Sequence, residues 1–162
     1  MLFRSLLIDD FSDDTYSLMA IHCTLEDYRV AYLLNQYLNI NLIRKSKDLD
    51  FKYIASSYSI YEWKDKNQLI TWNLVSNVCK KEKDSLTSTG SLFKSQNKII
   101  RIHNLIPEHK KVNYFLKIND DENLINEKTL IHKIQEIPQI AAVYSIDRSE
   151  EHTSELQSRR NL

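Results

Sequence analysis

Gly90 is the only glycine in this chain of 162 residues. Loops that cradle phosphate, and the fingerprints that bind dinucleotides, need several glycines because a side chain would hold the backbone away from the ligand. The scarcity of glycine therefore excludes a P-loop and a GxGxxG motif. Because 42% of the residues are hydrophobic and 27% are charged, the composition is that of a globular protein.

The formal charge is zero, since 22 Lys and Arg balance 22 Asp and Glu. A neutral chain has no long-range field that attracts nucleic acid or an anionic membrane, so we expect neither as a partner, and only local charged patches remain open. No stretch approaches the roughly 20 consecutive apolar residues of a membrane helix, and residues 1–14 are too acidic for a signal peptide.

The two cysteines, Cys23 and Cys79, form no CxxC pair and are expected to be small buried side chains in a reducing cytoplasm.

The C-terminal segment differs from the rest of the chain. Residues 148–158 read RSEEHTSELQS, which resembles the in-frame translation of a sequencing-library adapter. Segments of that kind are left out of fold reasoning. We therefore expect a single domain over 1–147, with an N-terminal segment at 1–14, a mobile loop at 80–97, and an artefactual disordered tail at 148–162.

Hydrophobic periodicity predicts the element order β-α-β-β-β-β-β-α-β. A strand is expected at 16–23, and a helix is expected to open at Thr24, with Asp27 placed as in a capping box. The apolar residues of this helix form a face wide enough to predict burial on more than one side; they are Leu25, Tyr28, Val30, Tyr32, Leu33, Leu34, Tyr37 and Leu38. The other elements are strands at 40–44, 98–106, 111–118 and 139–146, a long hairpin of 51–64 with 68–78, and a helix at 124–136 with Leu130, Ile131 and Ile134 as its apolar stripe.

Two strand-helix-strand units that flank a hairpin predict an α+β fold, with an antiparallel or mixed sheet and both helices on one face. The closing unit, 112–146, resembles half of a ferredoxin-like domain in its pattern. Alternation along the strand at 111–118 predicts one set of side chains facing the core and another facing away. The first set is Val112, Tyr114, Leu116 and Ile118, the second is Lys111, Asn113 and Lys117, and Phe115 is an exception.

The segment 106–118, with the sequence IPEHKKVNYFLKI, resembles the signature of the IPExxxVDY family of small bacterial proteins. Three further segments resemble that family: LEDYR at 25–29, LVSN at 74–77, and the closing segment 137–147. The resemblance covers about 16–147 and implies no activity, since the family is named only for its motif. Asn113 stands where the motif name has aspartate. An asparagine cannot hold charge or shuttle a proton, so its presence favours a structural role at that position.

Charged side chains at two places are candidates for binding. Glu26, Asp27 and Arg29 cluster at the start of the first predicted helix, where acids also stabilise the positive helix end. Glu108 follows Pro107, where the pair predicts a turn or, as an alternative, a buried acceptor. The histidines form no HxH, HxxxH or HExxH, so we expect no metal site and no cofactor. The serines and cysteines lack a nucleophile elbow, so no catalytic residue is assigned.

These features favour a noncatalytic binding or assembly module of the bacterial cytoplasm, whose partner is another protein or a second copy. The alternative is a small-ligand sensor or enzyme with a pocket around Glu26, Arg29 and Glu108; convergence of these side chains on one cavity would favour it. A third hypothesis, RNA binding, requires a cluster of lysines to share a face with Tyr61 and Trp63. These lysines are Lys45, Lys47, Lys52 and Lys64.

Overall fold

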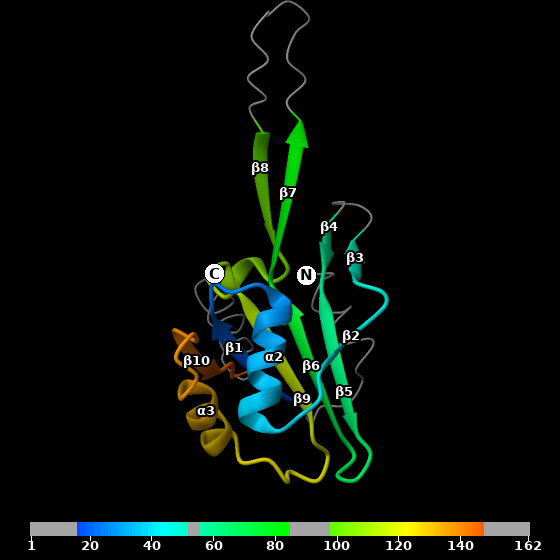
Figure 1. The fold of residues 1–162 in the computed structure, drawn as a ribbon, viewed down its shortest axis with the longest axis vertical. Coiled ribbons are helices and arrows are strands. Elements are labelled where there is room, and N and C mark those ends of the chain that lie inside the picture. The colour runs from blue at the N-terminus through cyan, green and yellow to red at the C-terminus, as the bar shows by residue number, and fades with distance from the viewer. Residues whose placement is uncertain (1–15, 52–55, 85–97, 148–162) are drawn as a thin grey trace, which may run out of the picture.

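The computed structural model describes residues 16–51, 56–84 and 98–147. Its centre is an antiparallel sheet of six strands in the order β10-β1-β9-β6-β5-β2 (Figure 1). The strands are β1 (Tyr16–His22), β2 (Ile43–Arg44), β5 (Ile60–Asp65), β6 (Ile70–Ser76), β9 (Tyr114–Asn119) and β10 (Ala142–Ser145). Central strands such as β6 are rich in β-branched and aromatic residues, which pack well on a pleated surface.

Both helices, α2 (Asp27–Leu38) and α3 (Glu127–Gln135), pack on one face of this sheet. Leu34 of α2, Ile134 of α3 and Leu116 of β9 are all fully buried in the same core cluster. The two helices also contact each other. The predicted α+β fold with both helices on one face is therefore confirmed.

The strands β9 and β10 both run antiparallel to β1, which lies between them. They are consequently parallel to each other, and α3 connects them. The strand-helix-strand unit expected at 112–146 is therefore present, and β1 lies between its two strands. Neither α2 nor α3, the helices of the described ranges, is long and apolar enough to cross a bilayer.

The second face of the sheet is covered by the segment that carries the IPExxxV motif. Ile106 and Val112 pack there against Ala20 and Phe115, and all four side chains are buried. Val112 lies before β9 begins, so the alternation of the strand does not extend to it. It is buried as predicted, but its predicted place on the same face as Tyr114, Leu116 and Ile118 is wrong. Lys117 is also buried, with 4% of its surface exposed, and its ammonium group lies 4.2 Å from the centre of the Tyr16 ring. The prediction for Tyr114, Leu116 and Ile118 is confirmed.

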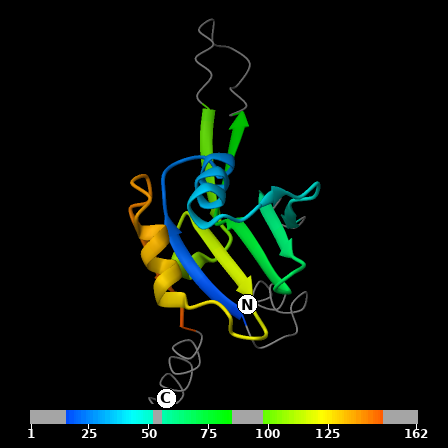
Figure 2. The same ribbon diagram turned by 60° about the horizontal axis from the view of Figure 1, so that its bottom comes forward.

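Two hairpins lie outside the central sheet: β3 (Leu49–Phe51) with β4 (Ser56–Tyr58), and β7 (Val78–Asp84) with β8 (Lys98–Asn104). The β7–β8 hairpin, which we call the ribbon, extends away from the body in both views (Figure 1, Figure 2). The predicted loop at 80–97 is therefore wrong for residues 80–84, which continue strand β7. Residues 85–97 of the predicted loop, residues 1–14, and the segment 148–162 lie outside the described residues. The described part contains ten strands, whereas the sequence predicts seven.

The helix starts differ from the prediction. α2 begins at Asp27 with Glu26 as its N-cap, and no side chain caps it, so the capping box from Thr24 is wrong. α3 begins at Glu127, where the Asn126 side chain accepts a hydrogen bond from the Thr129 amide at 3.1 Å. Asn39 ends α2 in the left-handed region, with φ of 54°, a position that asparagine tolerates well.

Candidate functional site

The side of α2 that faces away from the sheet carries exposed tyrosines. Tyr28 and Tyr32 are each 59% exposed and are neighbours on the helix surface because they are four residues apart. Arg29 and Gln36 are exposed on the same side, and the Gln36 side-chain amide donates to the Tyr32 hydroxyl at 2.6 Å. We call these four residues the outer face of α2. Tyr37 is also 45% exposed.

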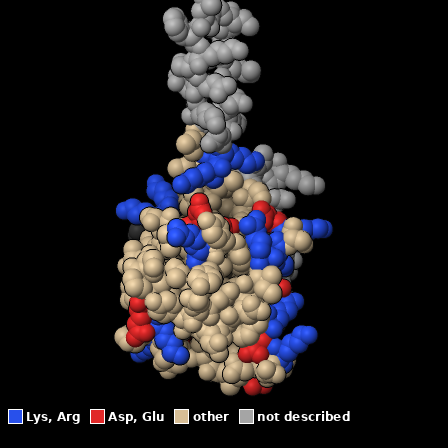
Figure 3. All heavy atoms as spheres, in the orientation of Figure 1, with Lys and Arg blue, Asp and Glu red and all other residues tan. Residues whose placement is uncertain are grey.

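The sequence predicts that α2 is buried on more than one side. This prediction is wrong for Tyr28 and Tyr32, which are exposed. Val30, Ala31 and Leu34 are the buried residues of the helix, and Leu33 and Leu38 pack against the same core in partly buried positions. A helix face open to water usually carries several charged residues, whereas the outer face of α2 has only Arg29. The space-filling view shows an uncharged surface over α2, with charged side chains around it (Figure 3). Tyrosine and arginine are enriched among the residues that dominate binding energy in protein interfaces.

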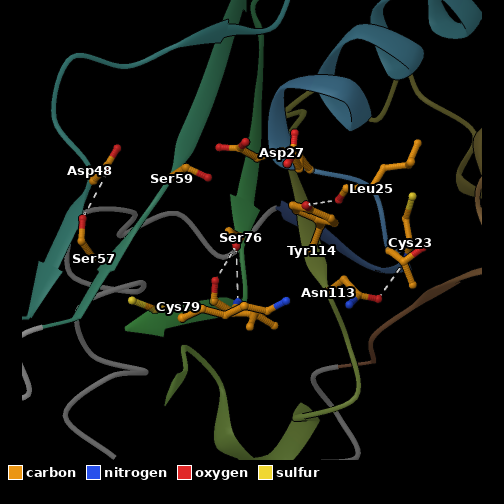
Figure 4. Close-up of a pocket in the computed structure, with 14 residues that line it drawn as sticks. Cys23, Leu25, Asp27, Asp48, Ser57, Ser59, Ser76, Cys79, Asn113 and Tyr114 are labelled. Carbon is orange, nitrogen blue, oxygen red and sulfur yellow. Dashed lines mark hydrogen bonds between the residues drawn. The ribbon is translucent and has the colours of Figure 1, made fainter. Parts of the chain in front are cut away.

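A cavity of about 390 Å³ lies beside the N-terminal end of α2, between the loop after β1 and the start of the ribbon (Figure 4). Its wall brings together residues from distant parts of the sequence, including Glu26 and Asp27 from the helix start and Lys80 from β7. Three serines also contribute to the lining: Ser57, Ser59 and Ser76.

Arg44 binds two of the carboxylates at this cavity. Its guanidinium lies 3.1 Å from Asp27 Oδ2 and 2.5 Å from Asp48 Oδ1. The hydrogen bond to Asp48 is the main cause that raises the pKa of Arg44 above its ordinary value. Asp27 also accepts a hydrogen bond from the Tyr28 amide at 2.9 Å. Asp27 therefore ties the first turn of α2 to β2.

Tyr114 and Asn113 fix the loop that leads into α2. The Tyr114 hydroxyl donates to the Leu25 carbonyl at 2.5 Å, and the Cys23 amide donates to Asn113 Oδ1 at 2.9 Å. Burial raises the pKa of Tyr114 well above its ordinary value, so the phenol remains a neutral donor. The contact to Cys23 gives Asn113 a structural role.

Both cysteines line this cavity, and they lie on opposite sides of it (Figure 4). Cys23 is 2% and Cys79 is 8% exposed, and both are free thiols, as expected from their spacing in the sequence. The Cys23 thiol donates to the Gln139 carbonyl at 3.3 Å. Across the described ranges, no three His, Cys, Asp or Glu side chains are grouped closely enough to hold a metal ion.

The four predicted binding residues do not form one site. Glu26 and Asp27 line the cavity. Arg29 lies on the outer face of α2, and Glu108 is exposed in the 3-10 turn η1 (Pro107–His109). The predicted pocket around Glu26, Arg29 and Glu108 is therefore not formed. The turn at Pro107 is confirmed, and the alternative of Glu108 as a buried acceptor is wrong.

Asn77 is a key residue that the sequence interpretation missed. It is fully buried, and its side-chain amide donates to the His109 and Val112 carbonyls at 2.9 and 2.8 Å. Its Oδ1 accepts from the Ile106 amide at 2.8 Å. These bonds hold the IPExxxV segment against the sheet. The only signal in the sequence was the LVSN segment, which resembles the same family as that motif.

The arrangement required for RNA binding by the long hairpin is absent from its described part. Trp63 packs against the core on the helix side of β5, whereas Lys64, the next residue, lies on the opposite face. Lys45 and Lys64 are paired with Glu62, at 3.4 and 3.8 Å. Lys52 lies outside the described residues.

No protein-family model matches the chain, and searches of curated proteins and of solved structures find no similar protein.

Proposed function

We propose that this chain is a noncatalytic protein-binding module of the bacterial cytoplasm, a member of the IPExxxVDY family, and that it docks onto a protein partner through the outer face of α2. One observation carries the proposal: Tyr28 and Tyr32 are 59% exposed beside Arg29, on a helix face with no other charge. Exposed aromatic residues of this kind gain most by burial in a partner.

The outer face of α2 indicates the chemistry of the partner. Arg29 requires a carboxylate, to which its planar guanidinium can donate two parallel hydrogen bonds. The tyrosine rings require an apolar groove whose rim can bond to their hydroxyls. The 12 residues of α2 extend about 18 Å, and one face of this length is much smaller than the roughly 800 Å² per partner of a standard interface. A partner groove that receives the exposed side of α2 is therefore favoured over a dimer held by α2 alone.

The polar groups around the cavity support binding rather than catalysis, since they hold the fold together. Asp27 is paired with Arg44, Tyr114 is bonded to a main-chain carbonyl, and Asn113 is bonded to a main-chain amide. A general base must be within reach of substrate and free to accept a proton. None of these three side chains meets that description.

Photo-crosslinking in cells tests the proposal. Tyr32 is replaced by p-benzoylphenylalanine, and the matched control places the same group at Lys133, an exposed position on α3. We expect a discrete adduct from position 32 and none from position 133, and we expect Arg29→Glu in the same chain to abolish it. Mass spectrometry then distinguishes a different protein from a second copy. The proposal is wrong if position 32 gives no adduct, or if both positions give the same adducts.

A small-ligand site in the cavity is a second candidate, because Glu26 and Asp27 both line this open pocket of about 390 Å³. Three carboxylates, on Glu26, Asp27 and Asp48, outnumber the cations of Arg44 and Lys80, so a cationic ligand is favoured. Thermal unfolding with putrescine tests this: binding to the folded state raises the melting temperature. A rise that Glu26→Gln abolishes supports the second candidate, and no rise counts against it.

A further inference from the structure

The two edges of the central sheet differ in how they are protected against pairing with another chain. β2, at one edge, has only two residues, and Arg44 within it and Lys45 after it are both charged. Charged side chains and very short strands are usual means by which proteins protect a sheet edge. β10, at the other edge, has four residues, none of which is charged or a proline (Figure 1). The edge at β10 is therefore the better suited to pairing with a further strand.

The main-chain groups of β10 alternate between β1 and the open edge. The amide of Ile146, one residue after β10, donates to the Leu18 carbonyl at 2.8 Å. Because the bonds of an antiparallel pair recur at every second residue, Tyr144 is also bonded to β1. The N–H and C=O groups of Val143 and Ser145 consequently point away from β1. Within the described residues, no second strand pairs with β10, and no turn or loop bonds to these four groups.

Tyr144 gives this edge an exposed aromatic side chain. It is 42% exposed, and its hydroxyl lies 3.1 Å from His22 Nε2 on the neighbouring strand β1. The two rings lie 5.5 Å apart, so the tyrosine is positioned by a contact within its own chain. Val143, in contrast, is 6% exposed and packs in the core with both helices. A strand that pairs with β10 would therefore meet Tyr144 on one face of the sheet and α3 on the other.

We propose that β10 pairs antiparallel with β10 of a second copy of this chain, across a two-fold axis at Tyr144. In this register, Val143 of each copy exchanges two hydrogen bonds with Ser145 of the other, so all four open groups of each copy are used. Tyr144 faces its own counterpart as a non-hydrogen-bonded pair, the pairing in which opposite side chains lie closest. The central sheet becomes continuous through the two copies.

A second copy is favoured over an extended peptide of another protein. Peptides that add to a sheet edge gain specificity from pockets for alternate side chains, and the cavity beside α2 is lined by no residue of β10. A second copy places a tyrosine opposite Tyr144, and aromatic cross-strand pairs stabilise a sheet. It also brings no like charge to the pairing, because β10 is uncharged. Since α3 lies beside β10, each copy also brings a helix to this edge (Figure 1).

Sedimentation equilibrium of the purified full chain, over a range of protein concentrations, tests this proposal. We expect a monomer–dimer equilibrium, which Tyr144→Glu and Tyr144→Lys should each weaken at least about 10-fold, because each places like charges directly opposite each other. An equal mixture of the two variants should restore the dimer, since opposite charges then meet at position 144. The matched control is Tyr37→Glu, which changes a tyrosine of similar exposure, 45%, on α2 and should leave the equilibrium unchanged.

Four outcomes overturn the proposal: a chain that is monomeric at every concentration, a Tyr144→Glu variant that dimerises as well as the unaltered chain, a mixture that stays monomeric, or an equal loss of dimer in Tyr37→Glu. An unchanged melting temperature of each variant at low protein concentration shows that its monomer is folded. The measurement needs no other protein, so its result is independent of the crosslinking at position 32. The dimer carries two copies of the outer face of α2, and this consequence alone rests on the proposed function.

Discussion

Two asparagines, Asn77 and Asn113, contribute differently to the structure around the IPExxxV segment: Asn77 bonds to both ends of the segment, and Asn113 directly follows it. Asn77 uses both ends of its amide, as a donor to two carbonyls and as an acceptor from one amide. Asn113 uses its oxygen to accept a hydrogen bond from the Cys23 amide. An aspartate can replace an acceptor but not a donor, so the same substitution should affect the two sites differently.

Asn77→Asp should lower the free energy of unfolding by at least about 3 kcal/mol, because it places a carboxylate against two carbonyl oxygens in a fully buried site. Asn113→Asp should change it by no more than about 0.5 kcal/mol, because the bond to Cys23 is kept. Urea unfolding of both variants measures the difference. Equal effects would show that the hydrogen bonds of Asn77 do not determine its contribution.

Tyr114 predicts a dependence of stability on pH. Its pKa is raised in the folded protein above the ordinary value of about 10. Its contribution is therefore fully present below pH 10 and is lost as the pH rises above 10, at up to about 1.4 kcal/mol per pH unit. Tyr114→Phe should be less stable at pH 8 and should lose less stability between pH 10 and 11, as measured by urea unfolding. Parallel loss in the two proteins over that interval would contradict the assignment.

At the scale of elements, the sequence patterns identify both helices and the strands of the central sheet, because periodicity depends on burial of one face. The patterns fail where burial depends on distant segments. Phe115 is buried because Ile106 and Val112, from the segment before β9, pack against it on the second face of the sheet, which no local pattern shows. Tyr28 and Tyr32 are exposed because no element within the described residues covers that side of α2.

The packing of α2 predicts a contrast between neighbouring positions. Leu34 is fully buried, so Leu34→Ala should cost about 2 to 5 kcal/mol through lost transfer energy and the cavity left behind. Tyr32→Ala should cost less than about 1 kcal/mol, because the ring is 59% exposed. Thermal or urea unfolding measures both. A Leu34→Ala effect below 1 kcal/mol would mean that α2 does not pack on the sheet as described.

For the whole molecule, the sequence is sufficient for the fold class but not for the site. Glu26 and Asp27, which are adjacent in sequence at a helix start, both line the cavity, and their role in binding stays a prediction. The separation of Arg29 from Glu108 could not be predicted, since it depends on which way α2 turns and on where η1 lies.

The adapter-like segment gives a prediction for the chain as a whole. Deleting residues 148–162 should change the free energy of unfolding by no more than about 0.5 kcal/mol, because these residues have no apolar periodicity with which to pack. Differential scanning calorimetry of the shortened and full chains tests this. A clear loss of stability on deletion would mean that the segment belongs to the folded protein.

The most direct test of the central claim, that the outer face of α2 binds a protein, is the affinity for the partner identified by crosslinking. Tyr32→Ala should weaken binding at least about 10-fold, as expected for a residue that dominates an interface. The control is Leu124→Ala, which removes a side chain that is 54% exposed and precedes α3. It should leave the affinity unchanged. If the two variants bind the partner equally well, the outer face of α2 is not the binding surface.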